Sequence, residues 1–174
     1  TSMSEKKNLR ILLVQQLFPA YRIPVFCRLA AHPDVDLTLI HGTALGRAPG
    51  EKGLQNVAEP MPFPVVTGPI RNVGFGTKAL LWFNEATDLA RSGQFDVVIH
   101  NFATRWASLG RMCKVQRAKG GGFILWGIGL SQTPTPFLDR IRLRMVAQAD
   151  ATILYSNTAR DRYAARGVPS NKLF

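Results

Sequence analysis

The sequence predicts an α/β protein built on a Rossmann-like, doubly wound and mainly parallel sheet. Apolar runs of strand length recur along the chain. Between most of them lie segments whose apolar residues are three and four apart, the spacing of an amphipathic helix. Strands that alternate with helices favour parallel pairing, because each helix carries the chain back across one face of the sheet. The 174 residues are the usual length of one domain.

Six segments are predicted to be strands. Residues 9–16 hold at their centre the continuous apolar run of a buried parallel strand. Residues 35–41 alternate apolar and polar side chains, and residues 61–67 contain prolines, which predict a short or edge strand. The other three predicted strands are residues 95–100, 122–126 and 151–155.

Five helices are predicted from the three-and-four spacing. They cover residues 21–31, 78–92, 106–119, 137–149 and a last segment that ends near residue 167. Thr77 is expected to cap the second helix, and Ser156 or Asn157 the fifth. Gly93 and Gly120 are expected to follow helix C-termini. The segments without either periodicity, residues 42–60 and 68–76, are predicted to be surface loops.

The chain is strongly basic. Lysine and arginine total 22 against 11 acidic residues, which gives a formal net charge of +11. Such a surplus fits nucleic acid, an anionic membrane surface or a negatively charged small substrate. The arginines are spread along the chain, so an arginine-rich composition without a functional cause is an open alternative. No basic stripe interleaved with aromatic residues and no recognition helix is found, so no nucleic-acid partner is expected.

Cysteine usage and hydropathy predict a cytoplasmic protein. Cys27 and Cys113 stand apart, with the spacing of neither a disulfide framework nor a zinc site, so no metal is expected. No apolar run approaches the ~20 residues of a membrane-spanning helix. Residues 1–8 are expected to be a tag remnant and flexible N-terminus, and residues 9–168 the Rossmann-like domain.

The ligand of a doubly wound sheet lies outside the carboxyl ends of its strands, which selects the loops that follow the predicted strands. Arg22 lies there at a helix N-terminus, where backbone amides favour an anion; a solvent-facing arginine is the alternative. His100 and Asn101 end the fourth strand. His100 is a candidate general base, with an unperturbed pKa of about 6.5; a structural histidine is the alternative. Gly127 and Gly129 allow either a close backbone approach to a ligand or a tight turn.

Several reaction classes find no support in the sequence. The first predicted ligand-side loop has no G-x-G-x-x-G dinucleotide motif. The chain also lacks the G-x-x-x-x-G-K-[ST] phosphate loop and a nucleophile elbow. Paired carboxylates are absent from the predicted ligand-side loops, and Asp96 and Asp150 fall at strand starts, on the far edge. A hydrolase or a metalloenzyme contained in these residues is therefore not predicted.

Four segments together resemble the N-terminal domain of bacterial family-4 glycosyltransferases, which have the GT-B fold. Residues 18–26 (FPAYRIPVF) look like the family's first strand-to-helix turn, and residues 95–99 (FDVVI) look like its "F-D-V-V" strand. Residues 125–130 (LWGIGL) are similar to a "W-G-H-G" segment. Residues 149–156 (ADATILYS), followed by RGVP and KLF, look like its approach to the interdomain linker, which implies that residues 169–174 are the start of that linker. The four segments span nearly the whole chain in the family's order.

The resemblance implies the acceptor-side half of a retaining glycosyltransferase in polysaccharide or cell-envelope biosynthesis. Such an enzyme moves a sugar from a nucleotide-sugar donor to a glycan or lipid-linked acceptor. In this family the C-terminal domain binds most of the donor and carries paired glutamates, so residues 1–174 alone are expected to be inactive. No cofactor other than the donor is expected. The residues expected to line the acceptor site are Tyr21, Arg22, Asn101, Arg105, Trp126, Gly127, Ile128, Gly129, Tyr155 and Ser156.

The resemblance has one departure and one further implication. Ile128 stands where the family often has a histidine, so any role of that histidine is missing here or has moved to another residue.

The family's N-terminal domain often faces a membrane. Arg140 and Arg144 share a helix face and are the predicted contacts with anionic lipid, at a peripheral position on the inner membrane face. The alternative to an enzyme is a non-catalytic Rossmann-like module that binds an anionic ligand or a membrane surface.

Overall fold

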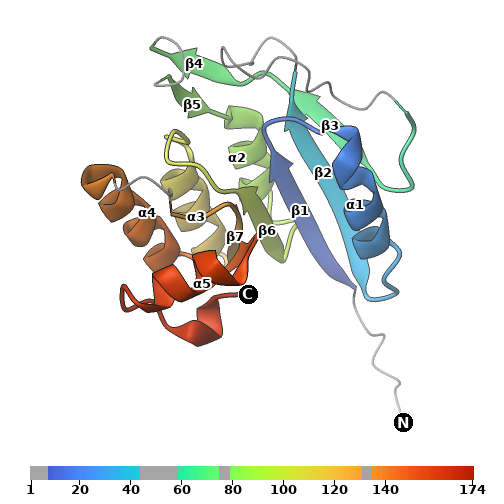
Figure 1. The fold of residues 1–174 in the computed structure, drawn as a ribbon. Helices are drawn as coiled ribbons and strands as arrows, with labels where there is room; N and C mark the ends of the chain where they lie inside the picture. The colour runs from blue at the N-terminus through green and yellow to red at the C-terminus, as the bar shows by residue number, and fades with distance from the viewer. Residues whose placement is uncertain (1–7, 44–58, 75–78, 131–134) are drawn as a thin grey trace.

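The computed structural model describes residues 8–43, 59–74, 79–130 and 135–174, which form a parallel sheet with helices packed against it (Figure 1). The six strands of this sheet lie in the order β3-β2-β1-β6-β7-β8, and every neighbouring pair is parallel. They are β1 (Leu9–Gln15), β2 (Val35–Gly42), β3 (Val65–Gly68), β6 (Val97–Asn101), β7 (Gly122–Gly127) and β8 (Ala151–Leu154). The order reverses between β1 and β6, as in a Rossmann-like sheet. The predicted fold class is confirmed.

Helices cover the sheet on both sides. The helices are α1 (Ile23–Ala30), α2 (Asn84–Arg91), α3 (Leu109–Arg117), α4 (Pro136–Gln148) and α5 (Asn157–Ala164). Side chains of β1 alternate between the two layers of the core. Ile11 and Leu13 pack in one buried cluster with Phe26 of α1. Leu12 and Val14 pack in the other, with buried residues of α2 and α3. The central strand is therefore apolar throughout, because both of its faces are buried.

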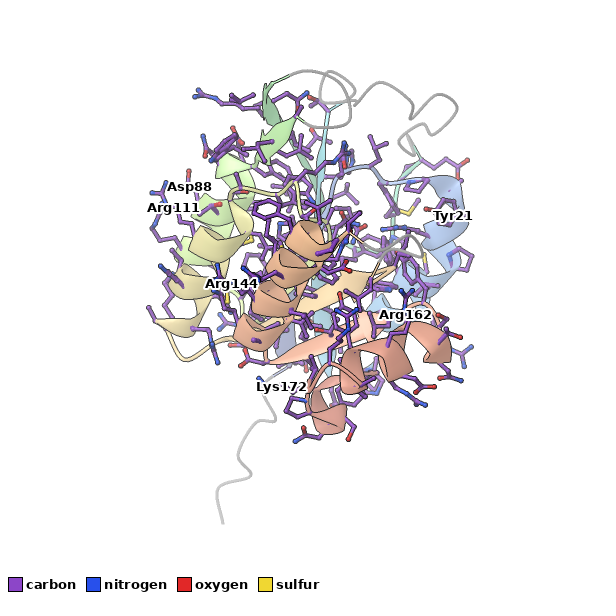
Figure 2. All side chains as sticks on the ribbon, turned by 60° about the vertical axis from the view of Figure 1, so that its left-hand side comes forward. Tyr21, Asp88, Arg111, Arg144, Arg162 and Lys172 are labelled. Carbon is purple, nitrogen blue, oxygen red and sulfur yellow. The ribbon has the colours of Figure 1, made fainter. Side chains whose placement is uncertain are left out.

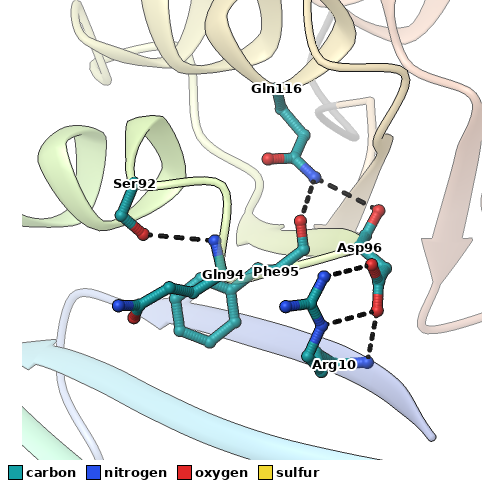
Figure 3. A network of polar contacts seen from close by, with 6 residues as sticks. All are labelled: Arg10, Ser92, Gln94, Phe95, Asp96 and Gln116. Carbon is teal, nitrogen blue, oxygen red and sulfur yellow. Dashed lines mark hydrogen bonds and ion pairs between the residues drawn. The ribbon is translucent and has the colours of Figure 1, made fainter. Parts of the chain in front are cut away.

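A polar network fixes the amino-terminal edge of the sheet (Figure 3). Arg10 of β1 donates from Nη2 to Asp96 Oδ1 at 2.7 Å, and from both Nε and its backbone nitrogen to Asp96 Oδ2 at 3.0 Å. Gln116 of α3 donates from Nε2 to the carbonyl oxygens of Phe95 and Asp96, at 3.1 and 3.2 Å. These bonds join β1, the segment before β6, and α3. Asp96 lies on the edge opposite the carboxyl ends of the strands, as predicted.

The predicted helix over residues 78–92 is wrong in its first part. Leu80–Trp82 form strand β5, which pairs antiparallel with β4 (Arg71–Val73) inside the predicted loop 68–76. Leu81 is buried, whereas Leu80 is 43% exposed, which is the alternation of a strand. Leu81 also exchanges backbone hydrogen bonds with the segment after β6, from Arg105 to Ala107. Tertiary pairing thus overrides a helical spacing that continues only from Asn84. Thr77, the predicted cap, lies outside the described residues.

Other boundaries differ by a few residues. The predicted strand 61–67 begins only at Val65, at the predicted sheet edge. Helix α3 begins at Leu109 and not at Trp106, because Trp106 is buried in a bridge to Leu81. The helix-ending glycines predicted at positions 93 and 120 have φ angles of 78° and 74°, in the left-handed region. Of the predicted loop 42–60, residues 44–58 lie outside the described residues.

The last residues run along strand β8. A short 3-10 helix (Ser170–Lys172) leads to Leu173, which bridges to Thr152 of β8. Phe174 accepts a backbone hydrogen bond from Leu154 at 2.8 Å and donates one to Thr152 at 3.0 Å. The domain boundary at residue 168 stays a prediction.

Asp96→Asn is expected to lower the free energy of unfolding by about 1–2 kcal/mol, because Arg10 loses a two-point, charge-assisted hydrogen bond. Urea denaturation measures this loss. Asp88→Asn is the matched control, since it removes a more exposed ion pair with Arg91 and should cost less than about 0.5 kcal/mol. Equal losses in the two variants would show that the network does not hold the edge.

Candidate functional site

A pocket of about 110 Å³ opens at the point where the strand order reverses. It lies beyond the carboxyl ends of β1 and β6, where doubly wound sheets bind their ligands. The residues that line it are Gln15, Gln16, Leu17, Pro19, Tyr21, Arg22 and Asn101. Three predicted site residues, Tyr21, Arg22 and Asn101, therefore meet in one pocket.

The loop after β1 positions two of these side chains. Leu17 and Phe18 are buried, and the Phe18 ring stacks on Phe26 of α1 with centroids 5.6 Å apart, which anchors the loop. Pro19 is extended, and a 3-10 turn (Ala20–Arg22) follows directly into α1. This sharp turn at the end of a buried strand leaves Tyr21 65% exposed on the ligand side.

Arg22 connects the end of the central strand β1 with the segment after the edge strand β8. It donates from Nη1 to Gln15 Oε1 at the end of β1, and from Nη2 to the hydroxyl oxygen of Tyr155, just after β8, at 3.0 Å. Its guanidinium carbon also lies 5.6 Å from the ring centre of Tyr21. Burial raises the pKa of Tyr155, although the charge of Arg22 opposes this, so the phenol is neutral at physiological pH. Two predicted site residues far apart in the chain are thus in direct contact.

Amide groups form the rest of the pocket. Asn101 accepts a hydrogen bond at Oδ1 from Trp106 Nε1 at 3.2 Å, which orients its side chain. Arg105, another predicted site residue, donates from Nη2 to Gln16 Oε1 at 2.6 Å. Gln15 is 1% exposed, and its Nε2 has no hydrogen-bond partner in the part of the chain that the structure describes. A buried amide N–H without a partner is costly, and this one belongs to a residue that lines the pocket.

His100 is fully buried, in contrast to the pocket residues. Its Nδ1 bonds the Asn101 carbonyl oxygen at 2.7 Å, and its ring packs edge-on against Trp106 with centroids 5.1 Å apart. Burial lowers its pKa to about 4, although the bond to Asn101 opposes this shift. These surroundings favour the structural role over that of a general base, which must reach the proton that it removes.

Packing explains two glycines, one at the end of β7 and one just after it. A Cβ at position 127 would lie 2.8 Å from Phe102 Cβ, too close for any other residue without a shift. Gly129 has a φ of 88°, and a Cβ there would lie 3.1 Å from the ring of Tyr163. The sequence left open a close approach to a ligand or a tight turn. The positive φ of Gly129 fits a turn, and contacts of either glycine with an acceptor stay predictions.

The remaining predicted site residues lie around the pocket without lining it. Trp126 of β7 packs its ring edge-on against Phe26, with centroids 5.6 Å apart. Ile128 is 72% exposed in the following loop. Ser156 caps α5 as predicted, since its Oγ accepts a hydrogen bond from the backbone nitrogen of Ala159 at 3.2 Å. Acceptor contacts by these three residues stay predictions.

Sequence reasoning did not single out Gln15 and Gln16. They end the first strand directly after its apolar run, where a pair of polar residues is unexpected for a strand buried on both faces. That contrast was the signal in the sequence from which the two glutamines could have been identified.

Within the described ranges, no group of His, Cys, Asp and Glu side chains is arranged to hold a metal ion, and no helix has the length and apolar character to cross a membrane.

The burial of His100 predicts a pH dependence of stability. Because the folded-state pKa of about 4 lies below the usual 6.5, the folded protein binds this proton more weakly than the unfolded chain. The stability is therefore complete above pH 6.5 and falls by up to about 3 kcal/mol as the pH drops towards 4. Denaturation of His100→Asn should lack this part of the slope. His32→Gln, which replaces an exposed imidazole, is the control; an unchanged slope in His100→Asn would contradict the assignment.

No protein-family model matches the chain, and no curated protein matches it. Solved structures do match. UDP-GlcNAc 2-epimerase from Methanocaldococcus jannaschii aligns with a TM-score of 0.52 and 16% identity, over 96% of this chain and 44% of that protein. The enzyme from Neisseria meningitidis, solved bound to UDP-GlcNAc, aligns with a TM-score of 0.55 and 12% identity, over 95% and 45%.

A further crystal structure of UDP-N-acetylglucosamine 2-epimerase aligns with a TM-score of 0.57 and 14% identity, over 97% of this chain and 48% of that one. The chain therefore spans less than half the length of these structures. At such low identity the likeness establishes the fold alone: a Rossmann-like α/β domain that corresponds to part of a GT-B-like protein.

Proposed function

We propose that this chain is the acceptor-side half of a glycosyltransferase that uses a nucleotide-sugar donor. The observation that carries the proposal is the pocket where the strand order reverses, which amide and guanidinium side chains line. The four segments that resemble family-4 glycosyltransferases support it, since two of them contain Arg22 and Tyr155, which are in contact. The likeness to enzymes named for UDP-GlcNAc supports a nucleotide sugar as the substrate class.

The lining suits the binding of an acceptor. Beyond the bonds that their oxygens already accept from Arg22 and Trp106, the amides of Gln15 and Asn101 carry further donors and acceptors of hydrogen bonds, which matches the hydroxyl groups of a sugar. Tyr21 adds an exposed aromatic ring. No carboxylate, histidine, cysteine or lysine is among the lining residues. The described pocket is therefore fitted to hold and orient a sugar, and proton transfer falls to groups outside it.

The donor is expected to bind mainly outside this chain. The nucleotide sugar would then meet the acceptor beyond the carboxyl ends of β1 and β6, with the acceptor held by this half. No other cofactor is proposed. The acceptor is a glycan or a lipid-linked glycan.

A second candidate function is epimerisation of a nucleotide sugar, which the names of the matched structures favour. It makes a different demand on the site. Removal of a proton from a sugar carbon needs a base within hydrogen-bond reach, and the residues lining the pocket supply none near neutral pH. The absence of such a group among the described residues that line this pocket favours transfer.

The full-length protein that carries this chain is expected to release nucleotide diphosphate from a nucleotide sugar only when a glycan acceptor is present. UDP-GlcNAc is the first donor to test, and NMR of the nucleotide sugar follows the reaction. Asn101→Ala should raise the KM for acceptor about tenfold, because it removes a hydrogen bond from bound sugar. Asn171→Ala, at an exposed position far from the pocket, is the control. Formation of the C2 epimer without acceptor would establish the second candidate. If neither reaction is observed, the chain belongs to a non-catalytic binding module.

An exposed aromatic residue, Phe137, lies on the same helix as the two arginines of the predicted membrane contact. Phe137, Arg140 and Arg144 of α4 are three and four residues apart and all exposed, Phe137 at 75%. Neither arginine forms an ion pair with another described residue, whereas Arg142 between them is bound to Asp139. Arg111 of the neighbouring α3 lies on the same side of the molecule as Arg144 (Figure 2). An exposed helix face with an aromatic ring and cations is typical of a surface that binds anionic lipid.

Flotation with lipid vesicles tests this contact in the full-length protein. Vesicles that contain phosphatidylglycerol should bind it more strongly than vesicles of phosphatidylcholine alone. Arg140→Ala with Arg144→Ala should weaken binding about thirtyfold, at about 1 kcal/mol for each cation near the surface. Arg28→Ala with Arg71→Ala makes the same charge change at exposed positions on α1 and β4 and is the control. Equal losses in the two double variants would overturn the assignment of α4.

A further inference from the structure

Arg22 differs from the arginines that form ion pairs in this protein. The ion pairs between described residues are Arg10–Asp96, Arg91–Asp88, Arg117–Asp150, Arg142–Asp139 and Arg160–Asp161. The hydrogen bonds of Arg22 go to neutral oxygens, Gln15 Oε1 and the hydroxyl of Tyr155. Among the described residues, no carboxylate pairs with it. Its positive charge at the edge of the pocket is therefore not neutralised by the residues that hold it.

The guanidinium of Arg22 is nevertheless held in place. Its two hydrogen bonds go to residues on different strand ends, Gln15 at the end of the central strand β1 and Tyr155 after the edge strand β8. Tyr155 stays a neutral phenol at physiological pH, so it fixes the guanidinium without cancelling its charge. A guanidinium has five N–H donors, and these contacts leave donors for a ligand. An oriented cation loses little conformational freedom on binding, which favours tight contact with an anion.

The groups around Arg22 also suit an anion. Gln15 is nine-tenths or more buried and has an unpartnered Nε2 donor. Asn101 lines the same pocket and has its Oδ1 already engaged by Trp106. Arg105 lies beside the pocket through its bond to Gln16 and adds a second positive charge. Hydrogen-bond donors and cations around a small pocket stabilise negative charge within it.

We propose that this pocket binds an anionic group carried by the acceptor sugar, a phosphate or a carboxylate, and that Arg22 contacts that group directly. The inference rests on the proposed function and names its acceptor class: a sugar that bears negative charge. A phosphate and a uronic-acid carboxylate share the chemistry that recognises them, two or more oxygens arranged to accept from one guanidinium. Tyr155 is a positioning residue, because it acts by holding Arg22.

Ligand-observed NMR with the full-length protein tests the inference. The probes are glucose 1-phosphate, glucuronate, glucose and UDP, at low and high ionic strength. At low ionic strength at least one of the two anionic sugars should bind at least tenfold more tightly than glucose, and high salt should reduce this preference. Whichever of the two binds more tightly identifies the anion as phosphate or carboxylate.

Three variants assign the preference to residues. Arg22→Gln should reduce the preference for the anionic sugar over glucose by tenfold to a hundredfold, about the value of a hydrogen bond between charged groups, because binding of the anionic sugar weakens more than binding of glucose. Tyr155→Phe should reduce the preference less, because Arg22 is kept but loses one anchor. Arg28→Gln removes an exposed cation from the far end of α1 and should change nothing. The midpoint of urea denaturation checks that each variant is folded.

The outcomes separate this inference from the proposed function. Equal affinity for charged and neutral sugars, or an equal loss for both in Arg22→Gln, would overturn the inference even if sugar transfer is found. Weaker UDP binding in Arg22→Gln, with anionic sugars unaffected, would also overturn it, because Arg22 would then serve the donor. An Arg22-dependent preference in a protein that transfers no sugar would support the anion site and overturn the proposed transferase function.

Discussion

The burial of β1 between β2 and β6 is the constraint on which the rest of the structure depends. Its register aligns residues 9–15 with β2 and residues 11–14 with β6, so the strand is paired along both sides. Its two faces fill both layers of the core. A strand so enclosed must end abruptly where polar side chains are needed, and the chain then turns at Pro19. The reversal of strand order beside this strand creates the space in which Gln15, Arg22 and Asn101 meet.

Much of the fold followed from local pattern. The apolar run of β1, the alternation of β2 and the helix-ending glycines were read from the sequence, because burial and positive φ each leave a residue-type signature. Strand β5 was not predicted. Leu80, Leu81 and Trp82 fit a helical stripe as well as a strand, and the deciding partners, β4 and the segment after β6, are distant in sequence. Short segments whose partners are non-local cannot be resolved by periodicity alone.

The candidate site was predicted only in part. The rule that ligands lie beyond the strand ends selected Tyr21, Arg22 and Asn101 correctly as neighbours. It could not show that Tyr155 reaches Arg22, because that contact joins residues 133 positions apart. Nor could the rule distinguish His100 from Asn101. Successive residues of a strand point to opposite faces, so His100 is enclosed by Trp106 and Phe123 while Asn101 lines the pocket.

The bond between Arg22 and Tyr155 also has a mechanical meaning. It spans the carboxyl ends of β6 and β7, so it ties the first loop of the ligand-side edge to the last. A single hydrogen bond of this kind contributes only about 1 kcal/mol. The position of Arg22 therefore depends on the segment between β8 and α5, which carries Tyr155, as well as on its own loop. A movement of either segment would shift Arg22, and with it the shape of the pocket that Arg22 lines.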